Sequence, residues 1–274
     1  MQQLFARLPI ASFVLLAGFL GVTALRVGNE TTTQMVLGSL LMFAFSWASA
    51  THLLGARAAL KFIAIALVIG WFAEQMGASR GWFFGVYTYT DVLGPKLGAV
   101  PLVIPLMWFA LVYAAYVIAN LIVWRAPVAP TLGWVDAVLV ALLGALIVTA
   151  YDLGAKTYMV DVAKAWTVGV TDGWYFGKTL EGFFGWAGTS FVILLAFQRA
   201  IRNAAPMASA RVNRWHALLP VGVYAGSMAF TIANGWPIET RSIVVFAMGI
   251  PVLAAFAAWR QWQAHDGPVR GAAA

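Results

Sequence analysis

Two carboxylic acids stand at the ends of strongly apolar stretches, and they are the best candidates for chemistry. Glu74 follows a run that ends in Gly-Trp-Phe-Ala, and Asp152 follows one that ends in Val-Thr-Ala-Tyr. A carboxyl inside a membrane pairs with a cation or keeps its proton, and a neutral carboxyl in a dry site can act as a general acid. Two structural roles are the alternatives to a catalytic role: the carboxylate could reach the membrane surface, or it could pair with Arg80. Asp91 is a third candidate, in a loop that water can reach.

A near repeat occurs in two loops between apolar runs. The pattern Gly-Trp-Phe-Phe-Gly at residues 81–85 recurs as Gly-Trp-Tyr-Phe-Gly at residues 173–177. Glycine permits tight turns, and Trp and Tyr favour the membrane surface, so an aromatic belt is one interpretation. A belt does not explain the same five-residue pattern twice. We therefore predict a structured lid beside the acids.

The composition indicates a membrane protein, because 62% of the residues are hydrophobic and 10% are charged, against about 25% charged in soluble domains. The net charge of +7 comes from basic residues between apolar runs, which favours topology and lipid head groups over nucleic acid. The chain has no cysteine, which excludes disulfides and thiolate chemistry. His52, His216 and His265 have no partner ligand at metal-binding spacing, so we expect neither a metal nor a cofactor.

Polar backbone groups in lipid must be satisfied within the chain, which predicts an all-α, polytopic transmembrane helical bundle. A span needs about 20 apolar residues. Spans 58–76 and 182–199 carry the weakest signals, so seven spans are the alternative to eight. We expect a single integral membrane domain over residues 1–274, with a disordered cytoplasmic tail at 261–274. The candidate spans are 8–25, 34–54, 58–76, 100–123, 133–154, 182–199, 215–234 and 241–260.

An even number of spans places both termini on one side of the membrane. More of the lysine and arginine residues fall on that side, which predicts cytoplasmic termini. Every acidic residue except Asp136 and Asp266 falls on the other side, together with both long loops. One membrane face is therefore expected to gather the acids and the aromatic loops, although the acids could also merely neutralise the basic residues nearby.

Two blocks of residues resemble the CruF-type carotenoid hydratase family, integral membrane proteins known as carotenoid biosynthesis proteins. The resemblance covers residues 35–200, with two more helices as a plausible continuation. The first block is Glu74, Gly77, Gly81, Phe84, Gly85, Tyr87, Tyr89, Leu93, Gly94, Val100, Pro101, Ile104, Pro105, Leu106 and Trp108. The second block is Asp152, Met159, Trp166, Gly173, Trp174, Tyr175, Phe176, Gly177, Leu180, Phe183, Gly185 and Trp186.

The resemblance implies an enzyme of carotenoid biosynthesis, a carotenoid 1,2-hydratase of the hydro-lyase class. Such an enzyme adds water to the terminal 1,2 double bond of an acyclic carotenoid end group, without a redox cofactor or metal. The expected partners are the lipophilic carotenoid, water, membrane lipid and other enzymes of the pathway. The expected location is the cytoplasmic membrane, with several spans.

Protonating an alkene needs an acid close to carbon, so Glu74 or Asp152 is the expected proton donor, and the other acid positions water or takes back a proton. The resulting cation can be stabilised by aromatic faces. Tyr113 could instead serve hydrogen bonding between helices. The expected substrate-binding side chains are Trp82, Tyr87, Tyr89, Trp108, Tyr113, Trp174, Tyr175 and Trp186.

Two other functions fit the same residues. An isoprenoid cyclase or isomerase would share the acid and the aromatics but would keep water away from the cation. A non-catalytic membrane carrier, or an assembly partner for other carotenoid enzymes, would need no proton transfer.

Overall fold

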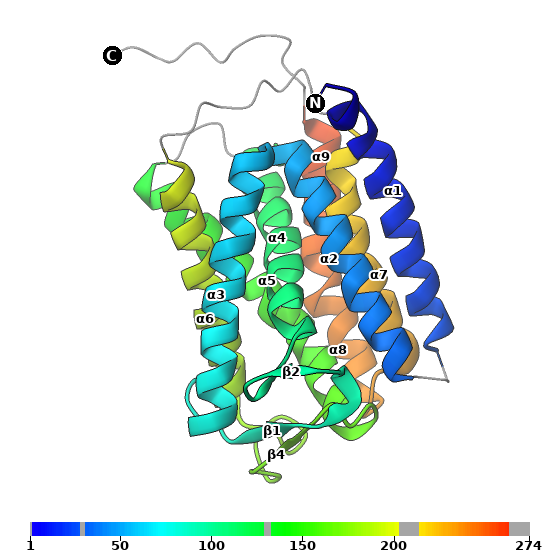
Figure 1. Ribbon diagram of the computed structural model, residues 1–274, viewed down its shortest axis with the longest axis vertical. Coiled ribbons are helices and arrows are strands. Elements are labelled where there is room, and N and C mark those ends of the chain that lie inside the picture. The colour runs from blue at the N-terminus through cyan, green and yellow to red at the C-terminus, as the bar shows by residue number, and fades with distance from the viewer. Residues whose placement is uncertain (1, 28–30, 129–132, 203–213, 263–274) are drawn as a thin grey trace.

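The computed structural model describes residues 2–27, 31–128, 133–202 and 214–262, with side chains from residue 7 onward. These residues form a bundle of long helices (Figure 1). The predicted tail at 261–274 lies outside the described residues from 263 onward. The helices are α1 Gln2–Leu25, α2 Thr32–Leu54, α3 Ala56–Arg80, α4 Val103–Trp124, α5 Trp134–Asp161, α6 Leu180–Ile201, α7 Leu219–Asn234, α8 Glu239–Ala247 and α9 Gly249–Gln261.

Within the described residues, eight helical segments are long and apolar enough to cross a membrane, the last made of α8 and α9 together. This confirms the predicted all-α bundle of eight spans. The helices run beyond the apolar stretches, because α3 continues from Glu74 to Arg80 and α5 continues from Asp152 to Asp161. The backbone hydrogen bonds of both helices continue after the hydrophobic residues end. Both acids therefore lie inside helices rather than at their ends.

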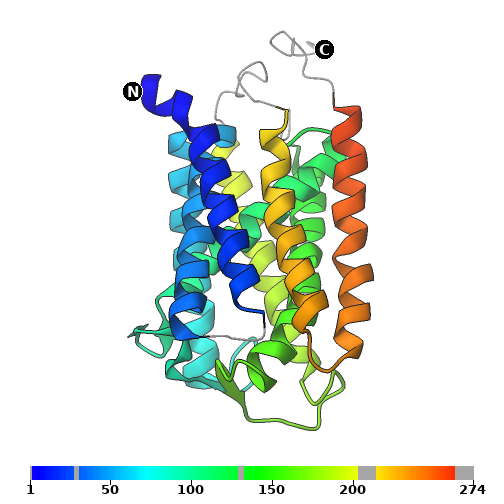
Figure 2. The ribbon, with the colours of Figure 1, turned by 90° about the vertical axis from the view of Figure 1, so that its right-hand side faces the viewer.

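The central helix of the bundle is α4, which packs against α2, α3, α5, α7 and α9 (Figures 1 and 2). Its side chains from Trp108 to Leu121 are all buried. The other helices surround α4 and support the two loops at one end of the bundle.

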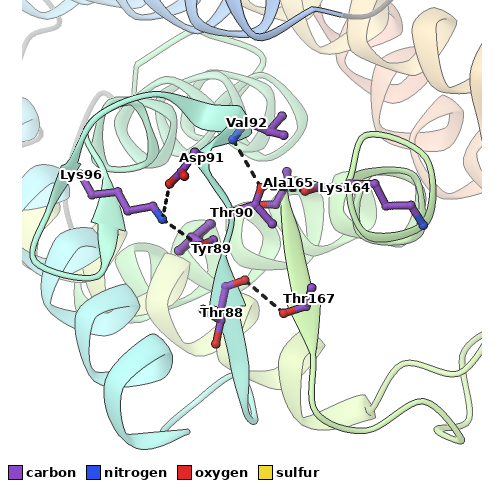
Figure 3. Close-up of polar contacts among 9 residues, drawn as sticks. All are labelled: Thr88, Tyr89, Thr90, Asp91, Val92, Lys96, Lys164, Ala165 and Thr167. Atoms are coloured by element: carbon purple, nitrogen blue, oxygen red, sulfur yellow. Dashed lines mark hydrogen bonds and ion pairs between the residues drawn. The ribbon is translucent and has the colours of Figure 1, made fainter.

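The two long loops lie at the same end of the bundle (Figure 1), as predicted. Strand β1 (Tyr87–Tyr89) pairs antiparallel with β4 (Trp166–Val168) of the other loop. The hydroxyl of Thr90 donates to the carbonyl of Lys164 at 2.7 Å (Figure 3). The first loop also holds η1 (Asp91–Leu93) and a small hairpin of β2 (Lys96–Leu97) and β3 (Val100–Pro101). Loops from distant parts of the chain thus form one joined structure.

Candidate active site

A cavity of about 300 Å³ lies where the paired loops meet α2, α3, α4, α5 and α6. Glu74 and Asp152 both line it, although they come from different helices. The structure therefore brings the two acids to one cavity. Other side chains that line the cavity include Phe84, Tyr87, Tyr89, Met107, Trp108, Tyr151, Lys156, Met159 and Trp186.

The carboxyl group of Glu74 is buried, with 4% of the residue exposed, and it is held by three neutral donors. The hydroxyls of Tyr87 and Tyr89 donate to Oε2, the latter at 2.8 Å. The indole Nε1 of Trp108 donates to Oε1 at 3.0 Å. A carboxylate has about four acceptor sites, so these bonds fill all but one. The side chain is locked in place, yet one oxygen position stays open.

Two glycines of α3 let these donors approach. A Cβ atom at Gly70 would lie 2.8 Å from Cγ of Trp108, and one at Gly77 would lie 2.8 Å from the hydroxyl of Tyr87. Real Cβ atoms do not come so close to other heavy atoms. Small residues on the Glu74 face of α3 thus admit the aromatic side chains that bond Glu74, as expected for close packing within a membrane.

Replacing Gly77 with alanine is expected to push Tyr87 off Glu74 and to destabilise the protein by about 1–3 kcal/mol, because the site is overpacked. Denaturant unfolding of the purified protein in detergent measures this change. Gly188→Ala in α6 is the matched control, because a Cβ there would meet nothing within 4 Å. The control is expected to change stability by less than about 1 kcal/mol. Equal destabilisation by both variants would contradict this role of Gly77.

The carboxyl group of Asp152 has a different environment. Only 1% of the residue is exposed, and Oδ2 lies 3.1 Å from Nζ of Lys156, one helical turn further along α5. The ammonium group of Lys156 also lies over the ring of Phe183, 4.3 Å from its centroid. Neither carboxyl oxygen of Asp152 has a hydrogen-bond partner among the described residues, and the ion pair with Lys156 involves Oδ2 and not Oδ1. This oxygen is a buried acceptor at a cavity that could hold water or substrate.

Lys156 was not among the side chains predicted for the site. The signal that could have found it is the spacing of four residues from Asp152, which puts the two side chains on one helix face. A lysine just beyond an apolar span is normally interpreted as a residue that sets membrane topology, unless a partner is identified. The structure shows that the pair is internal, with 11% of the Lys156 side chain exposed.

Three tyrosines of the loops have raised pKa values. Burial raises the pKa of Tyr87 and of Tyr89 well above the usual range, and the carboxyl group of Glu74 raises both pKa values further when it is ionised. Both phenols therefore stay protonated and remain hydrogen-bond donors at neutral pH. Burial, and then the charge of Asp152, raise the pKa of Tyr175 to about 12. The hydroxyl of Tyr175 donates to the carbonyl of Leu153 at 2.7 Å.

Aromatic rings form the apolar wall of the cavity. The rings of Trp108 and Trp186 lie 4.7 Å apart between centroids, and Trp186 lies 6.3 Å from Tyr151. Phe84 packs 6.3 Å from Trp108 on the loop side. Such ring faces attract a positive charge, by about 0.5–2 kcal/mol each. The wall suits a reaction that develops a cation close to a carboxyl group.

Five of the predicted residues do not line the cavity. Trp82 and Trp174 are 53% and 90% exposed, so both tryptophans of the repeated pattern point outward. Tyr113 is buried between helices and bonds the hydroxyl of Ser49 at 2.8 Å. Tyr175, in the second loop, packs against Phe183 of α6, with 5.1 Å between the ring centroids. The carboxylate of Asp91 is 98% exposed and pairs with Lys96 at 2.9 Å (Figure 3).

The part of the chain that the structure describes contains no group of three or more His, Asp or Glu side chains placed to hold a metal ion. His52 and His216 do lie together, with ring centroids 4.3 Å apart. His216 also contacts the hydroxyl of Ser49 through Nε2, at 3.2 Å. The two rings come from spans far apart in the sequence, so spacing along the chain did not predict this contact.

The chain was compared with protein families and with individual proteins. A family model described as carotenoid biosynthesis protein matches residues 30–256. This region contains both carboxyl groups, the tyrosines that bond Glu74 and the aromatic wall. No curated protein and no solved structure matches the chain. With eight apolar spans in the part of the chain that the structure describes and a family match over most of its length, the chain is a multi-pass membrane protein that belongs to the carotenoid biosynthesis protein family.

Proposed function

We propose that the protein adds water across the terminal 1,2 double bond of an acyclic carotenoid end group and forms a tertiary alcohol. The observation that carries this proposal is the pair of buried carboxyl groups, Glu74 and Asp152, on one small cavity with an aromatic wall. Ligand pockets usually measure about 300–1,000 Å³. A cavity of about 300 Å³ suits an end group better than a whole extended polyene.

In this proposal, Glu74 supplies the proton from its one open oxygen position. The proton bonds to the CH carbon of the terminal alkene, the π bond breaks, and the positive charge appears on the dimethyl carbon. The new carboxylate is stabilised at once by its three donors, Tyr87, Tyr89 and Trp108. Donors that are in place before charge develops cost no reorganisation during the reaction, which is an efficient form of electrostatic catalysis.

Asp152 completes the reaction from the other side of the cavity. Lys156 stabilises Asp152 in its ionised form, and the open Oδ1 accepts a hydrogen bond from the attacking water. The water oxygen bonds to the cationic carbon while Asp152 takes the released proton. Return of that proton to Glu74 through water restores the starting state. The sum is one alkene and one water giving one alcohol, with no electron gained or lost.

The membrane arrangement is part of the same proposal. The protein lies in the cytoplasmic membrane with its termini in the cytoplasm, so the cavity and both loops face the other side. The ends of a polyene that spans the bilayer lie near the membrane surfaces. A site at the loop end of the bundle can therefore reach an end group while the chain stays in lipid.

Expression in a host that makes acyclic carotenoids tests the proposal. The expected product is heavier by one water and carries a hydroxyl on the dimethyl carbon, identified by mass spectrometry and NMR. A product of unchanged mass would indicate a cyclase or isomerase instead. Unchanged pigments in cells that contain the folded protein would favour a carrier or an assembly partner.

A further inference from the structure

The main cavity has room for the end of a lipid chain and for little more. An apolar protein cavity of about 150 Å³ holds one molecule of benzene. The main cavity measures about 300 Å³, so it holds about two groups of that size, or about two isoprene units. The rest of a longer chain stays outside, in lipid. The protein therefore selects its substrate by the part of the molecule that lies next to the two acids.

The mouth of the cavity shows where such a chain leaves it. Val86 of the first loop and Glu181 in the first turn of α6 line the cavity, and both are exposed. The helix before that loop, α3, packs against α6 (Figure 1). Trp82 of the same loop and Phe184 of the same helix are 53% and 74% exposed. Tryptophan at the end of a span favours the membrane surface, so the mouth opens where the lipid begins.

Apolar, adaptable side chains form part of the lining. Met35, Met107 and Met159 come from three different helices, α2, α4 and α5. Methionine adjusts to apolar ligands of different shape. A hydrophobic pocket separates hydrocarbons that differ by one methylene group by only about 10- to 200-fold. Chains with the same branching differ less than that, so this lining fits a conjugated and an unconjugated isoprenoid alike.

We infer that the substrate class is wider than the carotenoids and includes colourless, unconjugated acyclic isoprenoid hydrocarbons that end in the same dimethyl-substituted alkene. The inference rests on the proposed function, because it uses the same two acids. Glu74 protonates the CH carbon, the π bond breaks, and water bonds to the dimethyl carbon while its proton passes to Asp152. One alkene and one water again give one tertiary alcohol, with no electron gained or lost.

Squalene is the substrate for the test. Its ends are identical to the end group of an acyclic carotenoid as far as the second isoprene unit, and it has no conjugated double bonds. Squalane, the saturated hydrocarbon with the same carbon skeleton, is the control, because it has no π bond to protonate. Each hydrocarbon is supplied to the purified protein in lipid nanodiscs, beside an acyclic carotenoid, and the products are identified by mass spectrometry and NMR.

We expect squalene to gain water at its ends, with a kcat/KM within about tenfold of the value for the carotenoid, which is about 1.4 kcal/mol. Squalane should remain unchanged and should slow hydration of the carotenoid by competing for the cavity. Glu74→Gln should lower the rates with squalene and with the carotenoid by the same factor. Asp91→Asn, which changes an exposed carboxylate outside the cavity, should leave both rates within about twofold.

Hydration of the carotenoid with squalene slower by about a hundredfold or more would overturn the inference and leave the proposed function intact. Hydration of squalene at an undiminished rate by Glu74→Gln would also overturn the inference, because the reaction would then take place elsewhere. If the folded protein adds water to neither hydrocarbon, the proposed function fails and the inference fails with it.

Discussion

Replacing Glu74 with glutamine is expected to lower the hydration rate by about 10²–10⁴-fold, the usual contribution of a general acid. Glutamine keeps the size of the side chain and can still accept hydrogen bonds from Tyr87 and Tyr89. It has no acidic proton to give to carbon. The measurement is the initial rate of alcohol formation by the purified protein in lipid, with equal amounts of folded protein confirmed by thermal unfolding.

Asp91→Asn is the matched control for this variant. It also removes one carboxylate at the loop end of the bundle, but the Asp91 side chain is 98% exposed and does not line the cavity. Its rate is expected to stay within about twofold of the unchanged protein, because exposed ion pairs contribute little. A Glu74→Gln protein that forms alcohol at the same rate as the control would rule out Glu74 as the proton donor.

Replacing Lys156 with methionine is expected to destabilise the protein by about 3–5 kcal/mol, because it leaves the buried carboxylate of Asp152 without its cation. Methionine retains much of the apolar stem that packs near Phe183. The free energy of unfolding in mixed detergent micelles, measured with increasing denaturant, gives the change. Hydration should fall as well, because Asp152 would no longer be held ionised to accept the proton of water.

A double variant separates the charge from the packing. Adding Asp152→Asn to Lys156→Met removes the unpaired charge, so most of the lost stability should return while the hydration rate stays low. The difference between the single and double variants measures the coupling of the two side chains. If the two changes destabilise the protein additively, the ion pair at 3.1 Å does not stabilise the fold in the way described.

The membrane spans, and the position of both loops on one side of the membrane, could be predicted because a helix in lipid needs apolar residues along most of its length. Apolar runs of the required length mark spans, and the two loops follow the third and the fifth span, which places them on one side of the membrane. Glu74 and Asp152 could be identified for the same reason, because they are acidic residues next to long apolar stretches. The ends of the helices were less predictable, because α3 and α5 continue beyond their apolar runs at the end of the bundle where the loops lie.

Side-chain direction within the loops could not be read from the repeated pattern. The two copies adopt different turns, with a positive φ at Phe83 in the third position of one and at Phe176 in the fourth position of the other. Both tryptophans point outward, whereas Tyr87 and Tyr89, just after the first copy, point to Glu74. Direction depends on the pairing of β1 with β4, a contact between distant segments that composition does not encode.

The most direct test of proton transfer from Glu74 to carbon is hydration in heavy water, followed by NMR of the purified alcohol. If Glu74 protonates carbon, the product carries one deuterium on the carbon next to the new alcohol carbon, and Glu74→Gln forms this product at a strongly reduced rate. An alcohol without deuterium at that carbon, or the same labelled product at an undiminished rate from Glu74→Gln, would contradict it.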